Sequence, residues 1–357
     1  MTRIIYHYPK IRPYELLTVM IDTTGPDTHI PQHQKAGRDA SIRQEHPLTD
    51  AFTQGRLQHW VDIEVHQLGA GIYQGACTTL SSGRMHLVHE QQNRLIHKTG
   101  ALQKNRCTIS FALGRDPLKR FSHFLEPAPV TFLLPDSSEL DILVPAQVDT
   151  LYLCLEQDRL MAGARKLNPR FWERPPQGLQ AFNTPETGRL VAGLMSLLSL
   201  EAADVLSAQT ERLLMDSVLL ALDQATEVQC SEALESKAHH RAMQRVNAAR
   251  EYIDASIQEG QVPSMVDLCA HTYSSARTLQ YAFRKVMQMT PVTYLRILRL
   301  NKVRSTLNTA DTAETTVTQM ATRWGFLHLG EFARDYQRLF GERPSETLAR
   351  SSARKLA

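Results

Sequence analysis

The sequence lacks the features that define several large classes of protein. Its 357 residues include only five cysteines, an odd number, and no two of them have the C-x-x-C spacing of a zinc ribbon. No apolar run approaches the ~18 residues that cross a bilayer. The best candidate begins at Leu190 and ends after 11 residues, before Glu201. The first residues also lack an apolar core of signal-peptide length. We therefore expect reduced thiols, a cytoplasmic location and no membrane partner.

The motifs of common catalytic and metal sites are absent as well. There is no G-x-S-x-G, no Walker loop, no G-x-G-x-x-G and no H-E-x-x-H. The front half is rich in histidine, and His86, His89 and Glu90 stand close together. Residues three apart on a strand point to opposite faces, however, so solvated histidines are favoured over a metal site. We expect no catalytic residue, no metal ligand, no cofactor and no enzymatic activity.

Charge is unevenly distributed along the chain. The net formal charge is only +3, but the residues from Arg241 to the end contain 17 Lys and Arg against 10 Asp and Glu. This part has a net charge of +7, whereas the remainder, with 23 basic and 27 acidic residues, has a net charge of −4. The asymmetry favours a polyanion as the partner of the C-terminal third.

The first two thirds of the chain have a sequence pattern typical of strands followed by helices. From Trp60 to about Leu155, short apolar segments such as VDIEVHQL, CTISFAL and TLYLCL recur about every ten residues between Gly, Pro, Asp and Ser. No helical pattern separates them, which favours an antiparallel sheet or a small barrel. Helices are expected at about 185–202 and 207–227. The predicted fold class of this part is α+β.

A polar stretch, QCSEALESKAHHRA, interrupts the pattern at residues 229–242 and is interpreted as a linker. Residues 1–228 are then expected to form an effector-sensing and dimerisation domain. Residues 243–357 read as helices and are expected to form an all-α DNA-binding domain.

The same apolar skeleton occurs twice in this last domain, 53 residues apart. The corresponding residues are Ser275 and His328, Leu279 and Phe332, Phe283 and Tyr336, Pro291 and Pro344, and Leu295 and Leu348. The i, i+4, i+8 spacing places the apolar members on one buried face of a short helix. A smaller helix precedes each copy. Each copy therefore predicts a helix-turn-helix unit, at about 264–287 and 316–340.

A longer helix, PVTYLRILRLNKVRSTL, is expected between the two units. Its roughly 17 residues span about 25 Å, which allows it to hold the units at a fixed separation. At a separation of about 34 Å, both second helices would enter successive major grooves on one side of B-DNA. The apolar residues would repeat because one scaffold is built twice. The outward residues would differ because each copy faces different bases.

The module from about residue 264 to 348 resembles the AraC/XylS family of bacterial transcription regulators. The resemblance is carried by DLCA, SARTLQYAFRK, TPVTYLRILRLNKVRSTL, TVTQMATRWGF and FARDYQRLFGERPSETL. It implies two helix-turn-helix units behind a domain that dimerises and senses a ligand. The family usually has Gly where this chain has Tyr273 and Gln288. Both residues are expected to adopt a positive φ, at a cost of about 1 kcal/mol each.

The resemblance also places base-reading residues on the first recognition helix. Arg277, Gln280 and Tyr281 fall where base readers sit in the family. Arg can pair bidentately with guanine, and Gln with adenine, in the major groove. The alternative is a solvated helix face, which the absence of acidic residues from this outward set makes less favoured.

On the second recognition helix the expected base contacts are Leu329, Gly330, Glu331 and Arg334. Arg334 is the best candidate. Glu331 either accepts a hydrogen bond from cytosine or pairs with Arg334 one turn away. Leu329 either touches a thymine methyl group or is buried.

Six residues are expected to contact phosphates, which position a protein on DNA without specifying sequence. Ser275 is expected to cap its helix, where free backbone N–H groups can also face a phosphate. His328 takes the corresponding position in the second copy. The expected set is Ser275, Arg284, Lys285, Arg296, His328 and Arg338.

These patterns predict a transcription regulator that binds promoter DNA. We expect it to be an activator, although the residues themselves do not separate activation from repression. The expected partners are double-stranded operator DNA, RNA polymerase, a second copy in a homodimer and a small-molecule effector whose pocket the sequence does not identify. Two alternatives stay open: an architectural DNA-binding protein without effector control, and a metal- or substrate-handling β-domain protein tethered to DNA.

Overall fold

The computed structural model describes residues 42–356, except 59, 83, 114–130, 137, 175, 201–206, 225, 228–236 and 311–314. Most of the expected linker, residues 229–236, therefore lies outside the described residues. The next helix, α6 (Lys237–Gln258), begins inside the stretch that was expected to be linker. Lys, Ala and Arg are good helix formers, which explains the early start. The division of the chain into domains at residues 228 and 243 stays a prediction.

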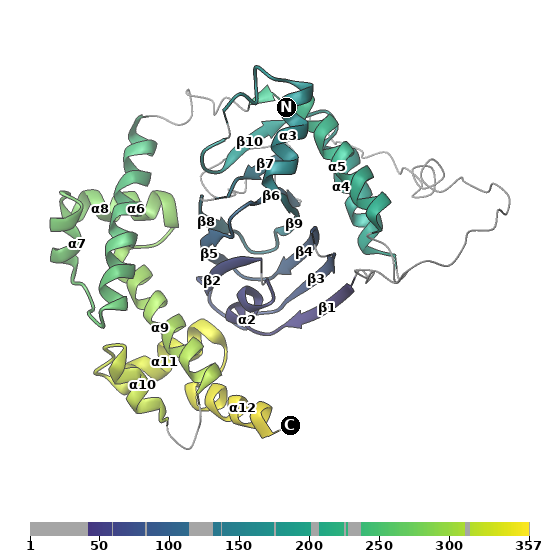
Figure 1. Ribbon diagram of the computed structural model, residues 1–357. Coiled ribbons are helices and arrows are strands. Elements are labelled where there is room, and N and C mark those ends of the chain that lie inside the picture. The colour runs from purple at the N-terminus through teal and green to yellow at the C-terminus, as the bar shows by residue number, and fades with distance from the viewer. Residues whose placement is uncertain are drawn as a thin grey trace, which may run out of the picture.

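The described part of the N-terminal region contains two antiparallel sheets (Figure 1). The larger sheet has the order β1 (Ile42–Leu48), β3 (Gly75–Ser81), β4 (His86–Gln92), β9 (Asp149–Glu156), β6 (Arg106–Leu113), β7 (Thr131–Leu134), β10 (Gln180–Asn183) and β11 (Thr226–Glu227). The smaller sheet has the order β2 (Val61–Gln67), β5 (Ile96–Leu102) and β8 (Glu139–Val144). The expected antiparallel β region is confirmed.

Alternation along the strands produces two apolar cores. In β9, Leu151, Leu153 and Leu155 point to the outer face of the larger sheet, whereas Tyr152 and Cys154 point between the two sheets. Both faces of this central strand are therefore buried. This explains why its sequence, TLYLCL, is apolar almost without interruption.

Three helices cover the outer face of the larger sheet: α3 (Gln157–Leu167), α4 (Thr187–Leu198) and α5 (Ala208–Asp223). The two helices expected at about 185–202 and 207–227 are present with shorter ends. Helix α3 was not expected, because only three of its eleven residues are buried. A short helix, α2 (Ala51–Arg56), connects β1 to β2. Among the described residues, no helix is both long and apolar enough to cross a membrane.

The expectation of solvated histidines in β4 is wrong. His86 is only 4% exposed, and its ring stacks on Trp60 with 4.2 Å between the ring centroids. The side chain of His89 is 12% exposed and lies 3.4 Å from Asp149. The two rings lie on opposite faces of β4, one held by stacking on Trp60 and the other beside Asp149. The described residues contain no group of three or more His, Cys, Asp or Glu placed to hold a metal ion.

The C-terminal region is built from helices. These are α6, α7 (Met265–His271), α8 (Ala276–Met287), α9 (Pro291–Thr309), α10 (Val317–Arg323), α11 (Leu329–Phe340) and α12 (Pro344–Leu356). Ser264 and Thr316 form capping boxes at the starts of α7 and α10, and Pro291 occupies the first turn of α9. The pairs α7–α8 and α10–α11 form the two expected helix-turn-helix units.

Helix α9 connects the two units and also meets the N-terminal region (Figure 1). Its first half packs into the apolar core that contains α6, α7 and α8, and its second half packs into the core that contains α10 and α11. Leu68 and Leu143 of the N-terminal region belong to the first of these cores. Polar contacts add to them, because Arg304 binds Asp50 at the start of α2.

We expect Gly341→Ala to destabilise the folded chain by more than the ~1 kcal/mol that a left-handed residue with a Cβ costs. Gly341 has φ = 75°, and a Cβ at this position would also overlap the side chain of Ile72 in the loop after β2. The free energy of unfolding in urea measures the effect. Gly260→Ala is the control, because Gly260 has φ = 76° but open space around it. Equal losses in the two variants would contradict the importance of the contact with Ile72.

Candidate nucleic-acid interface

Helix α8 presents a face without acidic residues to solvent. Ser275 caps the helix as expected, because its side chain accepts a hydrogen bond from the backbone N–H of Thr278 at 3.2 Å. Leu279 and Phe283 are fully buried, which turns the opposite side of the helix outward. The exposed residues on that side are Arg277, Gln280, Tyr281, Arg284 and Lys285.

The two positions at which the sequence departs from the family pattern have the expected backbone conformation. Tyr273, in the turn between α7 and α8, has φ = 47°, and Gln288, the C-cap of α8, has φ = 58°. The side chain of Tyr273 is 98% exposed and takes no part in the core. Each of the two positions therefore carries a backbone strain of about 1 kcal/mol, one directly before α8 and one directly after it.

Helix α11 repeats this arrangement with different outward residues. His328 is the N-cap, as expected, but its side chain makes no capping hydrogen bond. Gly330, Glu331 and Arg334 are exposed. Leu329 is 40% exposed, so the alternative that it is buried is wrong.

The cations of the second unit are partly compensated by acidic side chains. Asp335 of α11 forms ion pairs with Arg338 on the same helix and with Arg296 of α9. Glu331 lies 3.6 Å from Arg296, so the alternative in which it pairs with Arg334 is wrong. Arg334 makes no ion pair or hydrogen bond within the described part of the chain. Of the two guanidinium groups of α11, that of Arg334 is therefore the one without an ion pair.

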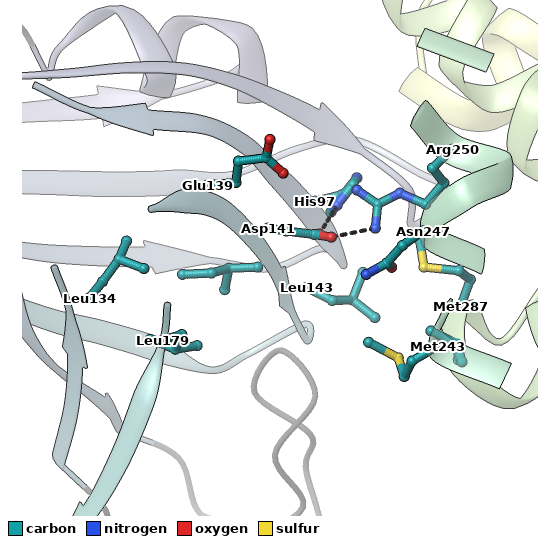
Figure 2. A pocket seen from close by; sticks show the side chains of 12 residues that line it. His97, Leu134, Glu139, Asp141, Leu143, Leu179, Met243, Asn247, Arg250 and Met287 are labelled. Atoms are coloured by element: carbon teal, nitrogen blue, oxygen red, sulfur yellow. Dashed lines mark hydrogen bonds and ion pairs between the residues drawn. The ribbon is translucent and has the colours of Figure 1, made fainter. Parts of the chain in front are cut away.

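A cavity of about 220 Å³ lies behind α8, between the smaller sheet and α6. Its apolar wall includes Leu143 of β8 and Met287 of α8. Figure 2 shows the side chains of His97, Asp141 and Arg250 meeting at one end, where strands β5 and β8 face α6. The cavity thus adjoins both the N-terminal region and the first recognition helix.

The polar end of this cavity is a coupled group of buried side chains. Asp141 accepts hydrogen bonds from His97 at 2.8 Å and from Arg250 at 2.7 Å. Burial, together with the nearby charge of Arg250, lowers the pKa of His97 to about 4. Burial alone would raise the pKa of Asp141, but the bonds from His97 and Arg250 hold it below its ordinary value. His97 is therefore neutral beside a charged carboxylate, and its other ring nitrogen lies 3.5 Å from the hydroxyl of Tyr294.

The sequence did not identify the residues that join the two regions. They include Asp50, Glu64, Gln67, Asp141, Arg250, Asn301, Lys302 and Arg304. One signal was available, because Asn301 and Arg304 fall at helical spacing from the apolar residues of α9 and are nonetheless polar. A polar residue at a position that this spacing buries indicates a specific partner.

Comparisons with known proteins agree with this geometry. A family model described as a helix-turn-helix domain matches residues 268–350, from α7 into α12. The probable thc operon regulatory protein of Rhodococcus erythropolis is 40% identical over 103 residues, which cover 29% of this chain and 30% of that protein. The XylDLEGF operon transcriptional activator 2 of Pseudomonas putida is 32% identical over 120 residues, which cover 33% of this chain and 76% of that protein.

A solved structure provides a further match. It is that of a probable AraC family transcriptional regulator from Rhodopseudomonas palustris CGA009. The identity is 37%, the match covers 30% of this chain and 97% of the other, and the TM-score is 0.28.

We expect the folded chain to lose stability as the pH falls from about 6.5 towards 4. The pKa of His97 is lower in the folded chain than the 6.5 of a free side chain, so protons bind more tightly to the unfolded chain in this range. The contribution of His97 to the free energy of unfolding is complete above pH 6.5. This contribution, up to about 3 kcal/mol, is lost on acidification. Midpoints of thermal unfolding between pH 8 and pH 4.5 measure this.

His97→Asn removes the titrating group and should flatten the acid part of the profile relative to the unaltered protein. His46, which is half-buried in the edge strand β1, provides the control through His46→Asn. Parallel acid profiles for the unaltered protein and His97→Asn would count against the assignment.

Proposed function

Because this chain belongs to the AraC/XylS family of transcription regulators, we propose that it controls promoters by binding their DNA through α8 and α11. The matched part of the thc operon protein is only 30% of its length, so the activity of the whole chain belongs to the proposal. The observation that carries it is the duplicated helix-turn-helix scaffold, with one exposed helix face in each copy.

In this proposal the outward residues of the two recognition helices read base edges in successive major grooves. Arg334 has the strongest support, because it is exposed and without a partner in the described structure. The proposed base contacts are Arg277, Gln280, Tyr281, Leu329, Gly330, Glu331 and Arg334.

The phosphate contacts divide into two groups. Ser275, Arg284, Lys285 and His328 are exposed and stand at or beside the recognition helices. Arg296 and Arg338 are paired with Asp335, so they reach a phosphate only by giving up or sharing that pair. We propose the first group as the main source of affinity that does not depend on sequence.

The N-terminal region serves as the sensor and the dimerisation part in this proposal. The cavity behind α8 supports control by a small molecule, because a molecule bound there would touch both β8 and α8. The matched relatives include operon activators, which supports activation, and activation implies contact with RNA polymerase. Binding to promoter DNA supports a cytoplasmic location.

Replacement of Arg334 by Ala tests the base-reading role. Selection of bound duplexes from a random pool first defines the preferred sequence. Arg334→Ala is then expected to weaken binding to that duplex by about 1–3 kcal/mol and to relax the sequence preference at one base pair. Binding to random duplexes should stay nearly unchanged. Titrations of labelled duplex at fixed salt measure both affinities.

Lys285→Ala is the matched variant for a phosphate contact. It should weaken binding to all duplexes alike and reduce the slope of log K against log salt by about 1. An equal loss on selected and random duplexes for Arg334→Ala would refute its base-reading role. Failure of the unaltered protein to prefer any duplex would refute the proposed function itself.

A further inference from the structure

Gln67 joins the smaller sheet to α9. It is the last residue of β2, an edge strand, and it is only 1% exposed. The side chain of Asn301 accepts a hydrogen bond from the backbone N–H of Gln67 and donates one to its carbonyl, both at 2.9 Å. The amide of Asn301 thereby takes the place of a neighbouring strand at the open edge of the sheet.

The same residue also reaches α11. The side-chain amide of Gln67 donates to the carbonyl of Leu339 at 2.8 Å, and the backbone N–H of Gly71 donates to the same oxygen at 2.9 Å. Leu339 lies in the last turn of α11, where carbonyl groups have no partner within the helix. The N-terminal region therefore caps the C-terminus of the second recognition helix.

Neighbouring contacts strengthen this junction. Ile72 packs against Gly341, directly after α11, and Lys302 of α9 binds Glu64 of β2 at 2.6 Å. The end of β2 and the loop that follows it are thus in contact with α9 and with α11 at once. A displacement of the end of β2 cannot leave both helices where they are, because the hydrogen bonds are directional and the packing is close.

We propose that Gln67 and Asn301 are positioning residues for DNA recognition by α11. They hold α11 against α9 so that the exposed face with Arg334 meets the bases of the second half-site, and they do not touch DNA themselves. The junction also gives the sensor region a direct route to the second helix-turn-helix unit. This inference rests on the proposed function and specifies how the N-terminal region acts on it.

Asn301→Ala in the full chain tests the inference. Binding is measured to the selected duplex and to two derivatives in which either the first or the second half-site is scrambled. Loss of recognition in Arg277→Ala and Arg334→Ala identifies which half-site belongs to α8 and which to α11. In the unaltered protein, scrambling either half-site should cost about tenfold or more in affinity.

In Asn301→Ala, the cost of scrambling the second half-site should fall to about twofold, while the cost of scrambling the first is unchanged. A purely structural role of Asn301 would lower both costs together. The side chain of Asn301 bonds to Gln67 and to the Ile297 carbonyl of its own helix, so the second unit should remain folded in this variant. Its circular dichroism and unfolding midpoint check that.

Three further variants make the test specific. Asn301→Asp keeps the size and one acceptor but sets a second acceptor against the carbonyl of Gln67, so it should behave like Asn301→Ala. Gln67→Met removes the bond to Leu339, together with those to Gly69 and Gly71 in the loop after β2, and leaves the backbone pair with Asn301. It carries the test if the Asn301 variants fail to fold. Thr309→Ala, exposed on the same helix and bonded only within it, should leave both costs unchanged.

Two outcomes overturn the inference. In the first, both scrambling costs are the same as in the unaltered protein for all three variants: Asn301→Ala, Asn301→Asp and Gln67→Met. In the second, both costs fall together in these variants. Either result, with an unaltered protein that still selects its duplex, rejects the positioning role and keeps the proposed function. An unaltered protein without any half-site preference rejects the proposed function, and the inference with it.

Discussion

Contact of α9 with three different neighbours is the constraint on which the rest of the structure depends. One part of its surface packs with the first helix-turn-helix unit through Tyr294 and Leu298, and another packs with the second unit through Val303 and Leu307. The remaining side meets the N-terminal region through Asn301 and the charged residues beside it. A helix enclosed in this way cannot slide or rotate without breaking one set of contacts. The relative placement of both recognition helices, and of the N-terminal region behind them, therefore follows from one helix.

The polar contacts on α9 specify an orientation more than they add stability. Burying Arg304 between Asp50 and Glu342 removes three charged groups from water, and the attraction between them largely offsets that cost. Removing one partner is different, because an uncompensated charge stays buried. The same asymmetry applies to Asn301, whose loss leaves two backbone groups of Gln67 without partners, at about 1–3 kcal/mol each. An apolar interface would tolerate small rotations, whereas these directional bonds do not.

The helical half of the fold could be predicted in detail because local rules determine it. The cap at Ser275, the Pro291 in the first turn of α9 and the 53-residue repeat can all be read from the sequence. The strands were harder, since the space between the sheets holds polar residues such as Glu90, which blur the alternation of β4. The junction of Asn301 with Gln67 could not be predicted, because 234 residues separate the partners and only the docking of two regions brings them together. For the recognition helices, the sequence indicated which residues face outward, but the ion pairs that leave Arg334 unpaired depend on tertiary placement.

The two recognition helices differ in charge, and this difference bears on what each requires of the scaffold. The outward face of α8 carries several cations and no acid, so in the proposed complex counterion release from DNA phosphates would be concentrated there. On α11, Asp335 compensates the guanidinium groups around it and Arg334 remains. Attraction between a basic surface and phosphates tolerates small displacements, because the force falls off slowly with distance. A bidentate pair between one guanidinium and one base does not tolerate them, because it needs two aligned hydrogen bonds. In the proposed complex, the helix that would depend on a single directional contact is α11, whose end is held by Gln67.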